Sequence, residues 1–297
     1  MVIQLNNKIN CLAFAFNKDS QIFSIGFDNQ IIIYKFKQRI QKQIQVLLYQ
    51  HKNDVFTLNF LKKSNQLISG EYDSTILIRS INNKNQWVCS QTIKGHYSSI
   101  YCLIINNNED LFISGKADKT IKFCVKKNKW ICSQTITDYQ NSIYSLSLND
   151  QQNYYSAQNK NWIVIQKTNV DCYGFRLCFV DDNLFKFQSI EGNLMHVYEM
   201  NSVRRQFSKT KDIIINQGND SEMLFPQQYI KSKQLLVNKH DKYINFIRLI
   251  ENEEFKLEQK IQFSTKQIFG SLSDDRDYLI TQDSISTEIQ IRECREE

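Results

Sequence analysis

Short runs of alternating apolar and polar residues, separated by polar turns, follow one another along this chain. Between residues 51 and 95 four such runs occur, at residues 55–60, 66–69, 75–79 and 87–93. They are rich in Ile, Phe, Tyr and Val and too short for helices, so the pattern predicts β-strands. The turns are rich in Asn, Asp, Lys and Ser, and Asn and Asp tolerate the left-handed backbone of tight turns. The chain is therefore predicted to be all-β.

The same pattern recurs at a fixed spacing. An isoleucine follows the same turn at Ile31, Ile76 and Ile121, a spacing of 45 residues each time. The sequence Trp-Val-Cys-Ser-Gln-Thr-Ile, which begins at Trp87, returns from Trp130 as Trp-Ile-Cys-Ser-Gln-Thr-Ile. Four strands in about 40–45 residues are typical of one blade of a β-propeller.

The length of the chain predicts the number of blades. A chain of 297 residues accommodates seven units of about 42 residues. The last unit ends after three strands, and residues 1–5 are left over at the start, so we expect residues 1–5 to complete the last blade and close the ring. The prediction is a single domain, residues 1–297, folded as a seven-bladed propeller with four antiparallel strands per blade. The predicted blades are residues 7–50, 51–95, 96–138, 139–173, 174–220, 221–265 and 266–297.

Composition and charge narrow the class of protein. With one proline, eight glycines and 41% hydrophobic residues, the chain is neither fibrous nor disordered. It has no apolar run long enough to span a bilayer, so we expect no membrane partner. The net charge is +6, and the basic residues are spread rather than clustered, so nucleic acid is not the expected partner.

The eight cysteines indicate neither a disulfide framework nor a metal site. No Cys-x-x-Cys pair occurs, and the spacing of Cys172 and Cys178 does not suit zinc. The first residues lack the basic and apolar regions of a signal peptide. We therefore expect free thiols, a cytoplasmic, reducing location and no cofactor.

Residues 7–138 resemble the WD40-repeat family, and the likeness weakens after that. Histidines stand at its Gly-His signature, serines in its second strand and aspartates in its turn, whereas its terminal Trp-Asp is absent. Tyr34, Arg79 and Cys124 lie where its tryptophan would be. The resemblance implies a hydrogen-bonded network that ties the strands of each blade together. The network positions are His51, Ser69, Asp73, His96, Ser114, Asp118 and Asp28.

A histidine, a serine and an aspartate also have the composition of a catalytic triad. However, no Gly-x-Ser-x-Gly elbow occurs, and the trio His51, Ser69 and Asp73 recurs 45 residues later. An enzyme needs one site, whereas a repeat protein needs one network in each repeat. We interpret both trios as structural. Without a nucleotide-binding or zinc-protease motif, we expect no small-molecule substrate and no enzymatic activity.

What remains is recognition by surface loops. Two kinds of loop are expected on one rim of a propeller: those joining the fourth strand to the next first strand, and those joining the second and third strands. In WD40 proteins this rim commonly binds partners. Phe27, Tyr72 and Tyr97 stand out, because rigid aromatic side chains are good binding anchors, although they could instead pack sideways onto neighbouring loops. The expected rim residues are Phe27, Lys52, Asp54, Tyr72, Tyr97, Ser99, Ala117, Lys119, Gln140 and Lys160.

These observations predict a non-catalytic scaffold or adaptor that binds other proteins. Residues 87–96 and 130–136 also resemble fourth strands of the WD40 factor of cytosolic iron–sulphur protein assembly, which implies an adaptor role there. Two alternatives stay open. One is RNA or ribosome binding through a basic rim, and the other is an enzyme that uses the mouth of the channel.

Overall fold

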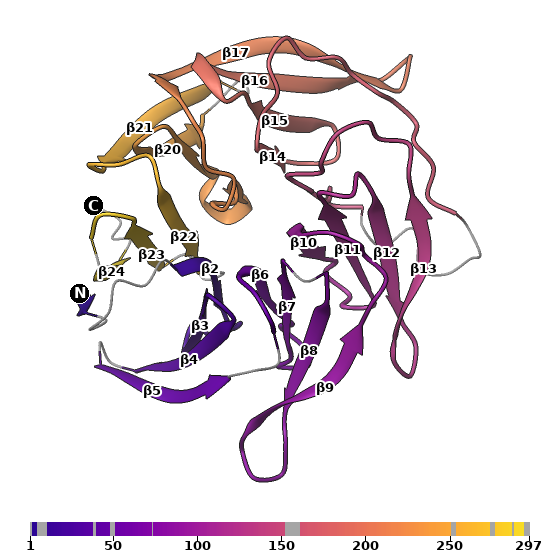
Figure 1. The fold of residues 1–297 in the computed structure, drawn as a ribbon. Helices are drawn as coiled ribbons and strands as arrows, with labels where there is room; N and C mark the ends of the chain where they lie inside the picture. Colours follow the sequence, from indigo (N-terminus) through magenta and orange to yellow (C-terminus); the bar gives the residue numbers. More distant parts are fainter. Residues whose placement is uncertain are drawn as a thin grey trace. The chain divides into compact units, whose positions relative to one another are not determined.

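The structure is a computed structural model, and its strands group into six four-stranded sheets within the described residues (Figure 1). The chain divides into two compact units: unit 1, residues 1–143 and 269–297, and unit 2, residues 144–268. The residues that the structure describes are 2–4, 11–37, 40–47, 51–72, 74–151, 161–250, 254–273, 277–286 and 288–293.

Unit 1 contains four of these sheets. The first is formed by β2 (Cys11–Phe16), β3 (Ile22–Phe27), β4 (Gln30–Lys37) and β5 (Ile40–Leu47). The second is formed by β6 (Val55–Phe60), β7 (Leu67–Glu71), β8 (Ile76–Ile81) and β9 (Trp87–Ile93). The third is formed by β10 (Ile100–Ile105), β11 (Leu111–Lys116), β12 (Ile121–Lys126) and β13 (Trp130–Ile136). The last is formed by β22 (Ile268–Leu272), β23 (Tyr278–Asp283), β24 (Glu288–Glu293) and β1 (Val2–Gln4).

Unit 2 contains the other two sheets. One is formed by β14 (Arg176–Phe179), β15 (Leu184–Gln188), β16 (Glu191–Asn201) and β17 (Gln206–Asn219). The other is formed by β18 (Gln228–Ile230), β19 (Leu235–His240), β20 (Tyr243–Leu249) and β21 (Phe255–Gln262), with a 3-10 turn at Lys231–Lys233. No helix in the described part of the chain has the length and apolarity needed to cross a membrane.

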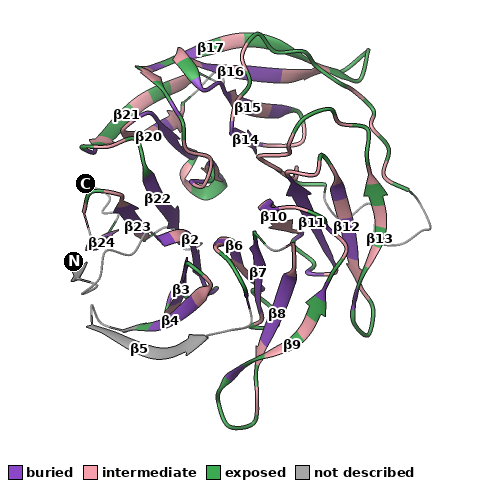
Figure 2. Cartoon of the chain, in the orientation of Figure 1, coloured by how far each residue is buried: buried purple, intermediate pink, exposed green. Residues whose placement is uncertain are grey.

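The position of a strand in its sheet explains its burial. The second strands β7 and β11 are buried along their whole length, because sheets or neighbouring strands cover both faces. The fourth strands β9 and β13 alternate between covered and exposed residues, because one face meets water (Figure 2). Apolar side chains of adjacent sheets pack together. In the second sheet Trp87 lies 5.8 Å from Phe60, centroid to centroid, in a cluster that also includes Ile31 and Ile33 of the first sheet.

The prediction of seven blades is wrong. Residues 139–173, the predicted fourth blade, contain no strand in their described parts, 139–151 and 161–173. Instead, the hydroxyls of Ser145 and Ser147 accept hydrogen bonds from the backbone N–H groups of Leu177 and Phe179, at 3.2 and 2.9 Å. Side chains thus make the contacts with β14 that a backbone ladder would make, and periodicity alone does not distinguish the two.

The N-terminal strand does not close a seven-bladed ring. β1 pairs antiparallel with β24, with Ile3 opposite Ile289, and it completes only the sheet that also holds β22 and β23. The expected closure depended on a count of seven, whereas the described residues form six sheets.

The cysteines differ in part from the expectation of free thiols. Cys124 of β12 lies opposite Cys132 of β13, and the two form a disulfide. The expectation is therefore wrong for this pair. Cys294 lies outside the described residues, and the free cysteines are Cys11, Cys89, Cys102, Cys172 and Cys178.

Candidate functional site

A buried polar network crosses the second sheet of unit 1. Nε2 of His51 lies 2.7 Å from Oγ of Ser69, and its Nδ1 lies 2.5 Å from a carboxylate oxygen of Glu71. Arg79 of β8 donates to the same Ser69 oxygen at 2.5 Å. Each of these four residues is 1% exposed or less. Arg79, at the position where the WD40 family has its tryptophan, thus takes part in the network through its side chain.

Chemistry fixes the direction of these hydrogen bonds. A carboxylate can only accept, so Nδ1 of His51 carries the proton that it shares with Glu71. If His51 is neutral, Nε2 then accepts the Ser69 proton, and the serine oxygen accepts from Arg79. Burial lowers the pKa of Arg79 to about 10, and Cys89 and Glu71 oppose that shift. The guanidinium therefore keeps its charge at neutral pH.

The third sheet repeats the histidine–serine bond with different surroundings. Nε2 of His96 lies 2.7 Å from Oγ of Ser114, while its Nδ1 lies 3.4 Å from Asp118. The ammonium of Lys116, which is fully buried, lies 3.7 Å from the same carboxylate. Burial, and next the charge of Lys116, lower the pKa of His96 to about 4. His96 is therefore neutral at pH 7.

Asp118 is held in place by its turn. Its carboxylate accepts from the Thr120 hydroxyl at 2.5 Å and from the backbone N–H of Tyr97 at 3.1 Å. Burial raises the pKa of Asp118, but these hydrogen bonds and the nearby cations outweigh it and lower the pKa overall. Asp118 therefore fixes the loop that carries Tyr97.

The predicted network also includes Asp73 and Asp28. Asp73 lies outside the described residues. Asp28 is exposed in the turn between β3 and β4. Ile25 occupies the strand position that Ser69 and Ser114 occupy in the next two sheets. These three residues lie opposite equivalent residues of the first strands, namely Phe14, Leu58 and Leu103.

The predicted rim residues separate into exposed and buried side chains. Tyr72 is 58% exposed and Tyr97 is 91% exposed. Phe27 and Ser99 are buried, which corrects the expectation that they face a partner. Lys160 lies outside the described residues. Asp54 and Ala117 are partly buried, and the exposed rim residues besides the two tyrosines are Lys52, Lys119 and Gln140.

Hydrogen bonds fix the loops that carry the exposed tyrosines. The backbone N–H of Tyr72 donates to the carbonyl of Asp54 at 3.1 Å, and that of Ala117 donates to the carbonyl of Ser99, also at 3.1 Å. The donors of the two bonds are 45 residues apart, and so are the acceptors, so the bonds belong to the repeat.

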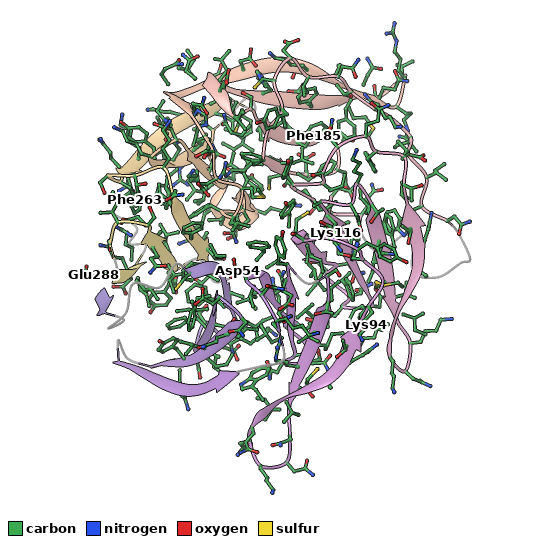
Figure 3. All side chains as sticks on the ribbon, viewed as in Figure 1. Asp54, Lys94, Lys116, Phe185, Phe263 and Glu288 are labelled. Atoms are coloured by element: carbon green, nitrogen blue, oxygen red, sulfur yellow. A yellow bond between two sulfur atoms is a disulfide. The ribbon has the colours of Figure 1, made fainter. Side chains whose placement is uncertain are left out.

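Asp54 precedes β6 and Lys116 ends β11 (both labelled in Figure 3). Burial and the charge of Asp28 raise the pKa of Asp54.

Two half-buried aromatic residues, Phe56 and Tyr101, lie near Tyr72, and the sequence analysis did not predict them. The ring of Phe56 lies 6.2 Å from that of Tyr72 and 6.1 Å from that of Tyr101, centroid to centroid. Phe56 and Tyr101 both stand where the register of their strand shifts, and their spacing of 45 residues was the available signal. We call Phe56, Tyr72, Tyr97 and Tyr101 the aromatic rim.

Unit 2 has a buried charge cluster that the sequence did not reveal. Arg176 donates to the carboxylate of Asp220 at 2.6 Å and to the carbonyl of Phe225 at 2.9 Å. Lys239 forms an ion pair with the other oxygen of Asp220. Burial and the charge of Arg176 lower the pKa of Lys239 to about 8. Arg176 and Lys239, which belong to the two different sheets of unit 2, are thus joined through Asp220.

The described residues contain no group of three or more His, Cys, Asp or Glu side chains arranged to hold a metal ion.

Comparison with known proteins identifies WD40 repeats in part of the chain. A family model described as "WD domain, G-beta repeat" matches residues 41–80 and 87–124. A chain of the solved structure titled "Crystal Structure of Mitotic Checkpoint Complex" has a TM-score of 0.54, covering 98% of this chain and 77% of that chain. Residues 41–80 and 87–124 are thus WD40 repeats, and the sheets are those of a β-propeller. The solved chain is 14% identical to this chain, so the likeness concerns the fold alone. No curated protein matches this chain.

Proposed function

We propose that this WD40 propeller is a non-catalytic scaffold and that a partner protein binds its aromatic rim. The observation that carries the proposal is the exposure of Tyr97 and Tyr72, at 91% and 58%, on loops fixed by hydrogen bonds. A tyrosine presented in this way loses little conformational entropy on binding and offers a large contact area. The similar solved chain belongs, by its title, to a complex, which is consistent with protein partners.

The buried networks support a structural rather than a catalytic role. A nucleophilic serine must be reachable by its substrate and must have a base that activates it. Ser69 and Ser114 are both 0% exposed, and Arg79 already donates to Ser69. Two equivalent histidine–serine pairs are what a repeat uses to tie strands together.

A quantitative pull-down from native lysate tests the proposal. The bait would be the wild-type chain beside the double variant Tyr72→Ala, Tyr97→Ala. Ile131→Ala is a matched control, because Ile131 is 51% exposed on β13 of the same unit but lies outside the rim. We expect at least one partner to be lost in the rim variant only. Retention of every partner, equal loss in the control, or no partner at all would contradict the proposal.

The identity of that partner tests a finer proposal, a role in cytosolic iron–sulphur protein assembly. Its support is the likeness of residues 87–96 and 130–136 to that WD40 factor. Recovery of iron–sulphur assembly proteins by mass spectrometry is the expected result, and a partner from another process would contradict it. The cytoplasmic location stays a prediction, which microscopy of the tagged chain would check.

RNA binding is the second candidate, favoured by exposed Lys52 and Lys119 on the rim. Asp28 and Asp54 lie among the same loops and oppose a phosphate backbone. If RNA is the partner, affinity should fall steeply as salt rises, because bound phosphates release counterions. Binding that does not depend on salt would rule this candidate out.

A further inference from the structure

The hairpin formed by β16 and β17 is the longest in unit 2, with strands of 11 and 14 residues. Its tip, residues 201–206, is exposed throughout (Figure 2). The tip belongs to unit 2, whereas the aromatic rim belongs to unit 1. A hairpin of this length presents its turn residues away from the rest of its sheet.

The turn at the tip is fixed by Asn201. Its side-chain oxygen accepts from the backbone N–H groups of Val203 and Arg204, at 3.0 and 2.9 Å. The N–H of Arg205 donates to the carbonyl of Asn201 at 2.8 Å, and Arg205 has a left-handed backbone with a φ of 55°. Asn side chains fix turns in this way. The tip therefore presents its side chains in a defined geometry.

The base of the tip is anchored as well. The ring of Phe207 lies 5.0 Å from that of Phe185 and 5.8 Å from that of Phe179. The backbone of Phe207 exchanges two hydrogen bonds with the side-chain amide of Gln166, at 2.7 and 2.8 Å. Aromatic packing and the amide thus hold the turn from below.

The tip leaves two positive charges without an internal counter-charge. Arg204 and Arg205 are exposed and make no ion pair with any residue that the structure describes. Two carboxylates of the same hairpin are paired with other cations. Asp212 lies 2.9 Å from Lys209 and 2.6 Å from His196, and Glu199 lies 3.4 Å from Lys211.

Apolar side chains flank these arginines. Val203 is 88% exposed at the tip itself. Ile163 and Ile165 are 74% and 76% exposed on the segment that Gln166 holds against Phe207. We call Val203, Arg204, Arg205, Ile163 and Ile165 the tip surface.

We propose that the tip surface binds a segment of a partner protein in which Asp or Glu residues flank an apolar side chain. The planar guanidinium group matches a carboxylate with two hydrogen bonds, and the apolar flank gives the neighbouring side chain a place to pack. Two arginines are too few for a strong hold on a phosphate backbone or an anionic bilayer. A short acidic protein segment is the partner that fits.

The test measures binding to short synthetic peptides that alternate Glu with Leu. Matched probes are peptides with Gln in place of Glu or with Ser in place of Leu, a single-stranded RNA oligonucleotide and phosphatidylserine vesicles. The variant is Arg204→Glu, Arg205→Glu, with Arg204→Gln, Arg205→Gln as a milder version. The control is Lys127→Glu, Lys129→Glu, which reverses as many charges at the exposed hairpin tip between β12 and β13. Thermal melting verifies that each variant is folded.

We expect the Glu–Leu peptide to bind the wild type and the control, and to bind the arginine variant about tenfold more weakly. The preference for Leu over Ser in the peptide should shrink in Val203→Ser, Ile165→Ser. Equal weakening in the control would reduce the effect to net charge and overturn the proposal. So would no peptide binding at all, or tip-dependent binding of the RNA or the vesicles in place of the peptide.

Discussion

The second and third sheets of unit 1 share a buried histidine–serine bond but differ in the charged residues buried around it. Both hold a histidine nitrogen 2.7 Å from a serine oxygen. The last residue of β7 is Glu71 and that of β11 is Lys116, and both are 0% exposed. The carboxylate contacts its histidine directly, whereas the ammonium lies beside the aspartate of its network. The repeat therefore keeps the bond between strands and lets the charge beside it vary.

The same two sheets differ at the position where the family has its tryptophan. Arg79 lies opposite Cys89 and donates to Ser69. Cys124 lies opposite Cys132 and forms a disulfide with it. One sheet thus joins its third strand to its second by a hydrogen bond, and the other joins its third strand to its fourth by a covalent bond.

The largest effect should come from removing the acid of the second sheet. Glu71→Ala would leave the buried cation of Arg79 without its carboxylate, at a cost of about 3–5 kcal/mol of unfolding free energy. Glu71→Gln, which keeps an acceptor for His51, should cost less. Denaturant unfolding measures both. If Glu71→Gln, which also removes the charge, were as stable as the wild type, the electrostatic role of Glu71 would be disproved.

The third sheet should be more sensitive to acid. The pKa of His96 is about 4 in the folded chain, against an ordinary value of 6.5. Between these values the unfolded chain binds a proton that the folded chain does not, so stability should fall by about 3 kcal/mol as the pH drops from 6.5 to 4. Lys116→Met should raise the pKa of His96 and reduce this loss. Unfolding measured across that pH range, with NMR titration of the ring, checks both statements. An unchanged pKa of His96 in the variant would contradict the account.

The disulfide should have a moderate effect confined to the third sheet. Cys124→Ser, Cys132→Ser removes a link across a loop of 8 residues, which costs about 2 kcal/mol. A reducing agent should lower the melting temperature of the wild type to a similar extent. It should leave the double variant unaffected, and a further fall there would show that the agent acts elsewhere.

The smallest effect concerns a glutamine that joins the two sheets. The side-chain amide of Gln91 on β9 accepts from the N–H of Trp130 at 3.0 Å and donates to its carbonyl at 2.6 Å. Gln91→Ala should cost about 1–2 kcal/mol, because two partly buried backbone groups lose their partner. Gln91→Glu keeps only the acceptor, so its loss of unfolding free energy should lie between zero and that of Gln91→Ala. Equal stability of all three chains would show that water replaces the amide.

Periodicity predicted most of the fold of unit 1, because alternation and the 45-residue spacing report strands and repeats directly. The family resemblance placed Asp28 in a network, whereas the structure leaves Asp28 exposed in a turn that is one residue shorter. Gly26 faces Ile31 five residues later, whereas Gly70 faces Ile76 six residues later. The blade count failed at Ser145 and Ser147, whose alternation resembles that of a strand although their hydroxyls make the contacts.

The candidate site was only partly predictable. The exposed tyrosines follow turns, which sequence reveals, but the burial of Phe27 depends on packing around it. Glu71 and Lys116 resemble solvent-exposed turn residues in sequence. The pairing of Arg176 with Asp220, 44 residues away, follows from tertiary structure that no local pattern reports.

The central claim is that a partner protein contacts the aromatic rim, and site-specific photo-crosslinking tests it most directly. A photoreactive phenylalanine analogue would replace Tyr97, and in a second chain it would replace Ile131, which is also exposed on unit 1. The account predicts a crosslink to a protein from position 97 and none to that protein from position 131. A crosslink from position 131 alone, or from neither position, would contradict it.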